Sequence, residues 1–197
     1  MASLGHLAVG AFAGRALEVR SARKAAVPML LFAGLSMLPD VDYLGVALGV
    51  PNHGPCGHRG ASHSLVPALV ISLIVAALAP RWNLPRWRTA AVAGLVVGSH
   101  LLLDAMTTSS RGVPLFWPIT FQRFEMPWRP IPNAPCGLSY VSWQGFRVAC
   151  TEYLQFLPLL LFAFRPAPDE SGRAMNPIYR HYGKATRTLA RVLRRAS

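Results

Sequence analysis

The sequence Gly98-Ser-His-Leu-Leu-Leu-Asp104 places a histidine and an aspartate four residues apart within an apolar run that extends from Ala90 to Met106. On a helix this spacing sets the side chains of His100 and Asp104 on one face, with Cβ atoms roughly 5–6 Å apart, close enough to hold one cation. An uncompensated carboxylate at membrane depth costs at least about 2.5–3.5 kcal/mol. The pair therefore indicates a functional site that faces the protein interior.

The composition is typical of an integral membrane protein. The chain has 197 residues, of which 52% are hydrophobic, a net charge of +12 and a mean hydropathy of +0.33. An excess of basic residues also occurs in nucleic-acid-binding proteins, but here the apolar residues form long blocks and the basic residues lie between and after them. We therefore predict an all-α, polytopic membrane bundle whose partners are membrane lipids and not nucleic acid. The sequence leaves the oligomeric state open.

A bundle of about four to five apolar helices is predicted. The apolar segments are Ala2–Ala16, Ala26–Val50, Ser62–Ala79, Ala90–Met106 and Thr151–Phe164. Several are shorter than the roughly 20 residues of a full span, so tilted or broken helices are expected, and Pro39-Asp-Val-Asp42 interrupts the second. Gly5, Gly10 and Gly14 in the first segment suit close helix packing. The proline- and aromatic-rich stretch 109–148 is predicted to be a lid or binding loop.

The basic residues predict an N-out, C-in arrangement of a membrane-embedded domain over residues 1–165. Fifteen of the twenty Lys and Arg residues lie between the first and second helices, between the third and fourth, or after the fifth. Positive residues favour the cytoplasmic side, so these regions are assigned to the inside. In the basic tail, residues 166–197, apolar residues recur at three- and four-residue steps. This pattern predicts an amphipathic helix on the anionic cytoplasmic leaflet.

This topology brings polar residues from four segments to the outer, non-cytoplasmic end of the bundle. Imidazole and carboxylate groups without sulfur suit zinc or manganese in a hydrolytic site better than a structural zinc centre. A bound ion would neutralise the carboxylates and lower the pKa of a coordinated water toward about 7. We predict one or two divalent ions, with zinc favoured over manganese. The predicted ligands are His6, Asp40, Asp42, His63, His100 and Asp104.

Several of the candidate site residues also have a structural explanation. His6 suits an interhelical hydrogen bond, and Asp40 suits a helix cap. His58 suits an ordinary loop position, and His100 with Asp104 suits a buried hydrogen-bonded pair without metal. The metal hypothesis is preferred because the structural explanation requires a separate coincidence at each position.

Three motifs together resemble the family of LexA-regulated, inner-membrane, metal-dependent hydrolases. They are Leu38-Pro-Asp-Val-Asp42, His58-Arg-Gly-Ala-Ser-His-Ser64 and His100-x-x-x-Asp104, within a similarity over about residues 1–120. The resemblance implies a location in the bacterial inner membrane and hydrolysis at a membrane-embedded metal site. More distantly, the order of His and Asp residues is similar to the zinc-dependent phospholipase C and P1 nuclease group, which are all-helical phosphoesterases with a cluster of zinc ions.

The distant similarity implies which residues match the group's metal-binding pattern. His6 matches the first histidine of the pattern, and Asp40 or Asp42 matches its aspartate. The next histidine is matched by His58 or His63, and the HxxxD pair by His100 with Asp104. Asp104 would be the carboxylate that bridges two metals. The group also uses a further histidine and a second HxxxD/E pair, and after Asp104 this chain has only His181, in the basic tail. The resemblance therefore implies two ions at most.

The predicted function is hydrolysis of a phosphoric ester in a lipid or a lipid-linked phosphate. Whichever of Asp42 and His58 is not a metal ligand is expected to act as general base or acid. Arg59 is expected to bind a phosphate oxygen. The alternative is a non-enzymatic membrane protein, a metal-stabilised scaffold or a transporter, that uses the same residues structurally. An enzyme keeps an open coordination position at its metal, whereas a structural site is closed.

Overall fold

The computed structural model describes residues 3–17, 22–52, 54–82, 84–108, 111–135 and 137–166. Within these ranges the chain is helical, with two isolated β-bridges and no strand. The α-helices are α1 (Ser3–Leu17), α2 (Ala22–Ser36), α3 (Asp42–Ala47), α4 (Leu65–Leu78), α5 (Arg86–Ala105) and α6 (Trp143–Ala163). Four 3-10 helices join them: η1 (Leu38–Val41), η2 (Ala61–His63), η3 (Ala79–Trp82) and η4 (Gly137–Val141). The predicted all-α fold is confirmed.

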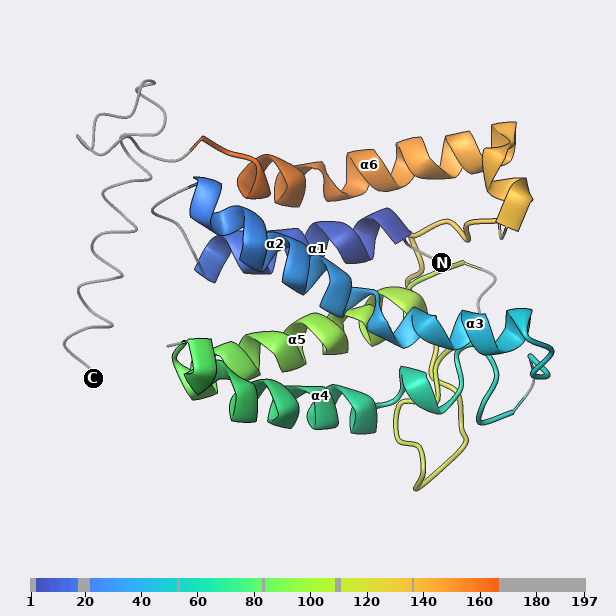
Figure 1. Cartoon of the computed structure of the whole chain (residues 1–197). Helices are drawn as coiled ribbons and strands as arrows, with labels where there is room; N and C mark the ends of the chain where they lie inside the picture. The colour runs from blue at the N-terminus through green and yellow to red at the C-terminus, as the bar shows by residue number, and fades with distance from the viewer. Residues whose placement is uncertain are drawn as a thin grey trace.

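The longer helices lie side by side, with α1 in the middle of the bundle (Figure 1). Helix α1 packs against α2, α5 and α6, and α4 packs against α5. The C-terminal ends of α1 and α4 and the N-terminal ends of α2 and α5 lie together, and we call this the basic end because Arg15, Arg81, Arg86 and Arg88 belong to it. The start of α1, η1, η2 and the end of α5 lie at the opposite end (Figure 1).

Glycines set the close contact between α1 and α2. A methyl group on Gly10 would overlap the backbone of Phe32, and one on Gly14 would overlap the carbonyl of Pro28. Because glycine has no side chain, the backbones of the two helices can approach closely, which is how small residues promote helix association in lipid. The packing predicted from these glycines is confirmed. Beside this contact, Phe32 forms a small buried core with Ala93 and Val96 of α5.

The predicted break in the second apolar segment is also confirmed. Helix α2 ends at Ser36, and the chain bends by 54° before it continues through η1 into α3. Pro39 has no N–H group to donate and occupies the first turn of η1, where none is needed. The bend turns Asp40 into the interior while the neighbouring Val41 stays exposed.

Four predicted helix starts differ from the structure, and the first is that of α2, which begins at Ala22 instead of Ala26. Helix α4 begins at Leu65, three residues later than expected, because residues 61–63 form η2 and Ser64 is extended. Helix α5 begins at Arg86 instead of Ala90. Helix α6 begins at Trp143 instead of Thr151, because the Ser142 hydroxyl caps it by accepting a hydrogen bond from the Gly145 N–H. The predicted loop 109–148 is therefore shorter than expected.

The surface of the bundle is strongly apolar. Large side chains with more than half of their surface exposed include Leu30, Leu31, Leu69, Leu73, Leu154 and Leu161. Exposed apolar patches of this extent are the expected lipid contact of a membrane protein.

Helix length gives fewer spans than predicted. By length and apolar composition, one described helix, α6, suffices to cross a membrane, and the bent pair Ala25–Ser36 with Leu38–Ala47 would make a second. The 15 residues of α1 or α2 reach about 22 Å, short of a hydrocarbon core of about 30 Å. Four to five spans are therefore not confirmed. The predicted amphipathic helix of the tail falls outside the described residues.

Candidate metal centre

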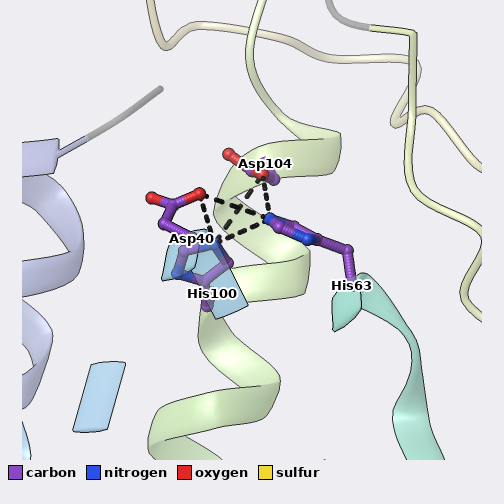
Figure 2. Close-up of side chains that lie close together, drawn as sticks. All are labelled: Asp40, His63, His100 and Asp104. Atoms are coloured by element: carbon purple, nitrogen blue, oxygen red, sulfur yellow. Dashed lines mark hydrogen bonds and ion pairs between the residues drawn. The ribbon is translucent and has the colours of Figure 1, made fainter. Parts of the chain in front are cut away.

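Four buried side chains meet where η1, η2 and α5 come together (Figure 2). We call them the buried quartet: Asp40 from η1, His63 from η2, and His100 and Asp104 from α5. One ligand atom of each lies within 4.8 Å of the others. His63 Nε2 is 3.3 Å from Asp104 Oδ2 and 3.4 Å from Asp40 Oδ1. His100 Nε2 lies 3.2 Å from His63 Nε2, so both imidazoles point at one small volume.

The two imidazoles of the quartet are oriented from behind. His100 Nδ1 lies 2.7 Å from the carbonyl oxygen of Ser36, and since a carbonyl only accepts, Nδ1 carries the hydrogen. His63 Nδ1 lies 3.2 Å from Asp42 Oδ2, which likewise only accepts. In the neutral rings the lone pair is then on Nε2, the nitrogen that faces the quartet. Metal-binding histidines are typically held in this way, by a carbonyl or carboxylate on the other nitrogen.

The quartet fits a divalent cation. His63, His100 and Asp104 are fully buried and Asp40 is 8% exposed, so water does not compensate their charges. Among the described residues, neither carboxylate oxygen of Asp40 accepts a hydrogen bond. A buried carboxylate that accepts no hydrogen bond is energetically costly unless a cation or a metal ion lies beside it. The quartet could therefore hold a metal ion, and its two nitrogen and two oxygen donors suit zinc or manganese.

The charges around His63 show the same demand for a cation. Burial disfavours the protonated ring, but the contacts of His63 with the carboxylates of Asp104, Asp40 and Asp42 outweigh it and raise the pKa of His63 to about 10. Without metal, a proton on His63 thus partly balances the three carboxylates. A divalent ion would replace that proton and supply more positive charge at the same place.

His6 lies beside the quartet. Its ring stacks on that of His100, with centroids 3.7 Å apart, and its Nε2 is 3.6 Å from Asp104 Oδ1. The side chain is buried, and neither ring nitrogen makes a hydrogen bond within the described residues. The structure thus brings His6 to Asp104, as the sequence predicts. Its role as a metal ligand stays a prediction.

Asp42 and His58 form a second layer, which we call the outer pair. His58 Nδ1 is 2.8 Å from Asp42 Oδ1. The other oxygen, Oδ2, accepts from the Ser62 hydroxyl and from the Arg59 backbone N–H, and also faces His63 Nδ1. With His63 these two residues form a second possible metal-binding group, which is partly exposed. Asp42, predicted both as ligand and as catalytic residue, therefore lies behind His63 and outside the quartet.

Arg59 turns inward. Its Nη2 donates to Asp104 Oδ1 at 2.8 Å, and the residue is 6% exposed. Its backbone has a φ of 58°, a left-handed conformation that costs a non-glycine residue of order 1–3 kcal/mol and is concentrated at functional sites. The phosphate-binding role predicted for Arg59 stays a prediction; here the guanidinium holds Asp104.

Three polar residues of this region were not among the predicted site residues. The Ser36 hydroxyl donates to the carbonyl of His6, and its own carbonyl orients His100. Ser62 holds Asp42. Glu152 of α6 is fully buried and accepts from the Leu4 N–H, so it caps the start of α1 near His6. A lone acid in an apolar helix could have signalled Glu152, whereas nothing in the sequence separates Ser36 from other helical serines.

The fold and the centre together define an all-helical protein with a lipid-compatible surface and a buried His/Asp cluster that could hold a metal ion. The chain belongs to the YdjM inner membrane protein family, which it matches over residues 1–167. It is 42% identical to inner membrane protein YbcI of Escherichia coli K12 over 134 residues, which cover 64% of this chain and 76% of YbcI.

A second relative is more distant. The chain is 35% identical to inner membrane protein YdjM of Escherichia coli K12 over 101 residues, which are 46% of this chain, and it spans 48% of YdjM. No solved structure matches the chain. The predicted inner-membrane location is supported by these names. LexA regulation and the relation to the P1 nuclease group stay predictions.

Proposed function

We propose that this protein is a metal-dependent hydrolase of the inner membrane that cleaves a phosphoric ester in a lipid or a lipid-linked phosphate. The observation that carries the proposal is the buried quartet, in which two imidazoles and two carboxylates from three elements face one point. Ligands of nitrogen and oxygen without sulfur are typical of hydrolytic metal sites.

The surrounding residues supply the other parts of a hydrolytic site. A divalent ion in the quartet would polarise a phosphoryl oxygen and lower the pKa of a water at the site. His58, held by Asp42 and partly exposed, is positioned to accept or donate a proton at the edge of the quartet. Arg59 fixes Asp104 through its guanidinium and thereby orients one ligand oxygen.

The arrangement of the helices supports an outward-facing site. We propose that the apolar helices enter the membrane N-out and C-in, with the basic end at the cytoplasmic side. The quartet lies at the opposite end of the bundle from the basic end (Figure 1). A centre in the outer leaflet meets lipid head groups directly, which favours a lipid or lipid-linked phosphate over a soluble substrate.

One observation favours a second candidate, a non-enzymatic membrane protein whose metal stabilises the bundle. All four quartet residues are buried, as in a closed structural site. An ion there would join η1, η2 and α5 without meeting a substrate. The two candidates predict the same metal content and differ in whether His58 matters.

Elemental analysis of the detergent-purified protein tests the shared premise. The wild type is expected to carry one equivalent of zinc or manganese, and His100→Ala is expected to lose it. Glu125→Ala is the matched control, because Glu125 is a partly exposed carboxylate that is paired with Arg129 and does not belong to the quartet. Metal retained in His100→Ala, or absent from a wild type prepared without chelators, would contradict the proposal.

Turnover separates the two candidates. Metal-loaded protein in mixed micelles is assayed for phosphate or head-group release from phospholipids and polyprenyl phosphates. The hydrolase proposal expects release that chelation and His58→Ala both suppress. Full metal content without release from any of these substrates would favour the structural candidate.

A further inference from the structure

A cavity lies beside the candidate metal centre, between two loops. It has a volume of about 210 Å³ and is lined by Pro55, Gly60 and Ala61 from one loop and by Trp117, Phe121 and Arg123 from the other. Gly60 and Ala61 lie between Arg59, which holds Asp104, and Ser62, which holds Asp42. One wall of the cavity is therefore the same short stretch that supports the centre.

Arg123 supplies the charge of this cavity. One of its guanidinium nitrogens, Nη1, donates to the carbonyl of Gly112 at 3.2 Å, which fixes the side chain in the wall. A guanidinium has five N–H donors, so this contact leaves others for a ligand. Within the described residues no carboxylate forms an ion pair with Arg123. The cavity thus presents a positive charge that no carboxylate of the described residues neutralises.

Two further arginines lie close enough to Arg123 to influence its guanidinium electrostatically. Burial, and then the positive charges of Arg111 and Arg59, lower the pKa of the Arg123 guanidinium. Arg59 is paired with Asp104, but like charges near one another still repel, and an anion at Arg123 would reduce that repulsion. Guanidinium groups match the geometry of phosphate oxygens better than other cationic side chains do. The charge therefore selects a phosphate over a neutral ligand.

The other cavity walls suit the rest of a lipid phosphate. Trp117 and Phe121 are aromatic, and Phe121 is mostly exposed at the surface. Tryptophan concentrates at the level of lipid head groups, where one side is apolar and the other wet, and Phe121 adds an apolar surface beside it. Gly60 packs so closely on the carbonyls of Pro55 and Gly57 that a methyl group would overlap them. The absence of a side chain there keeps the loop folded tightly around the cavity.

We propose that this cavity is a phosphate-binding subsite, in which Arg123 binds a phosphate group of the substrate beside the metal centre. The inference rests on the proposed function for the placement of that phosphate, and it narrows the substrate class to a phosphate carried by an apolar group. Arg123 is a binding residue in this site, and it is separate from the residues that hold the metal.

Calorimetric titration of the metal-loaded, detergent-purified protein tests the subsite. The two probes are dihexanoyl phosphatidic acid, a lipid phosphate, and glycerol 3-phosphate, its soluble counterpart. Losing a charge-assisted hydrogen bond of about 1.5–3 kcal/mol weakens binding about 10- to 100-fold, so Arg123→Ala is expected to lose affinity by that factor. Arg123→Lys is expected to fall between wild type and Arg123→Ala, because it keeps the charge and loses the fork. Arg129→Ala is the matched control, since Arg129 is an exposed arginine of the same loop paired with Glu125.

The outcomes distinguish the subsite from the proposed hydrolase. Binding of the lipid probe that depends on Arg123 supports the subsite, and equal binding of the soluble probe would assign it to free phosphate esters. Wild-type protein that binds neither probe, or Arg123→Ala that binds as tightly as wild type, overturns it. Metal content is measured on every sample. If the wild type takes up no metal but binds the probes through Arg123, the subsite is supported and the hydrolase proposal is contradicted. If the wild type holds its full metal content and binding does not depend on Arg123, the subsite is overturned and the hydrolase proposal stands.

Discussion

Asp40 and Asp42 stand two residues apart in the chain and occupy opposite kinds of environment. Asp40 is buried in the quartet, and neither of its oxygens accepts a hydrogen bond within the described residues. Asp42, in the outer pair, accepts from His58, Ser62 and the Arg59 backbone. A buried carboxylate that accepts no hydrogen bond is suited to bind a cation, whereas a carboxylate that accepts several hydrogen bonds is suited to position the side chains around it. The quartet and the outer pair thus differ in what they can do, although the same types of residue form both.

Replacing a quartet residue should have the largest effect, which is the loss of the bound metal. Asp40→Ala removes one of four ligand atoms and is expected to abolish stoichiometric metal binding, measured by elemental analysis after dialysis against a buffered metal solution. Glu125→Ala, which removes a surface carboxylate, should keep the metal. Wild-type metal content in Asp40→Ala would erase the distinction between the two aspartates.

Replacing His58 should affect turnover more than metal content. A positioned acid or base contributes about 100- to 10,000-fold to a rate, and His58→Ala is expected to lose turnover on a phospholipid within that range. Its metal content should stay at the wild-type level, because His58 is not in the quartet. Loss of metal together with activity would instead place His58 among the ligands.

Replacing Asp42 should weaken the metal without removing it. Outer partners of metal-bound histidines typically contribute about 10- to 100-fold to metal affinity, and Asp42→Asn is expected to lose affinity by that factor. Competition with a zinc-binding dye measures the affinity directly. A complete loss, equal to that in Asp40→Ala, would show that Asp42 ligates the ion.

The smallest effect concerns the metal-free protein, where replacing the two aspartates should change the free energy of unfolding by different amounts. Asp42→Asn disrupts several hydrogen bonds and is expected to lower the free energy of unfolding by about 1–3 kcal/mol. Asp40→Asn removes a buried charge that accepts no hydrogen bond and faces only the imidazoles of His63 and His100, so it should lower the free energy of unfolding by less. Denaturant unfolding in detergent with excess chelator measures both, and destabilisation by Asp40→Asn equal to that by Asp42→Asn would contradict the contrast.

Much of the fold follows from local sequence. The apolar segments became α1, α2, α4, α5 and α6, and Pro39 marked the break after α2. The start of α6 did not follow, because the Ser142 cap starts the helix eight residues earlier, in a stretch where polar and apolar residues are mixed. A helix cap consists of a single side-chain hydrogen bond, and many serines that could form one do not, so the sequence alone does not show which serine starts a helix.

The residues of the centre were recognisable as a set, and their ranking was not. Spacing of four residues placed His100 and Asp104 on one face of α5, and both joined the quartet. The side chain of Arg59 points inward because its backbone is left-handed. Non-glycine residues rarely adopt this conformation, so the sequence does not predict it. The cavity at Arg123 joins two loops more than fifty residues apart, and no local pattern relates them.

The amino-acid sequence fixes the kinds of ligand, the apolar helices and the pairing of His100 with Asp104, because each depends on spacing within one element. The choice of Asp40 over Asp42 for the quartet depends on the 54° bend after α2 and on where η2 carries His63. Those directions result from packing between α1, α2, α4 and α5. Contacts between distant elements set them, so they emerge only when the chain is folded.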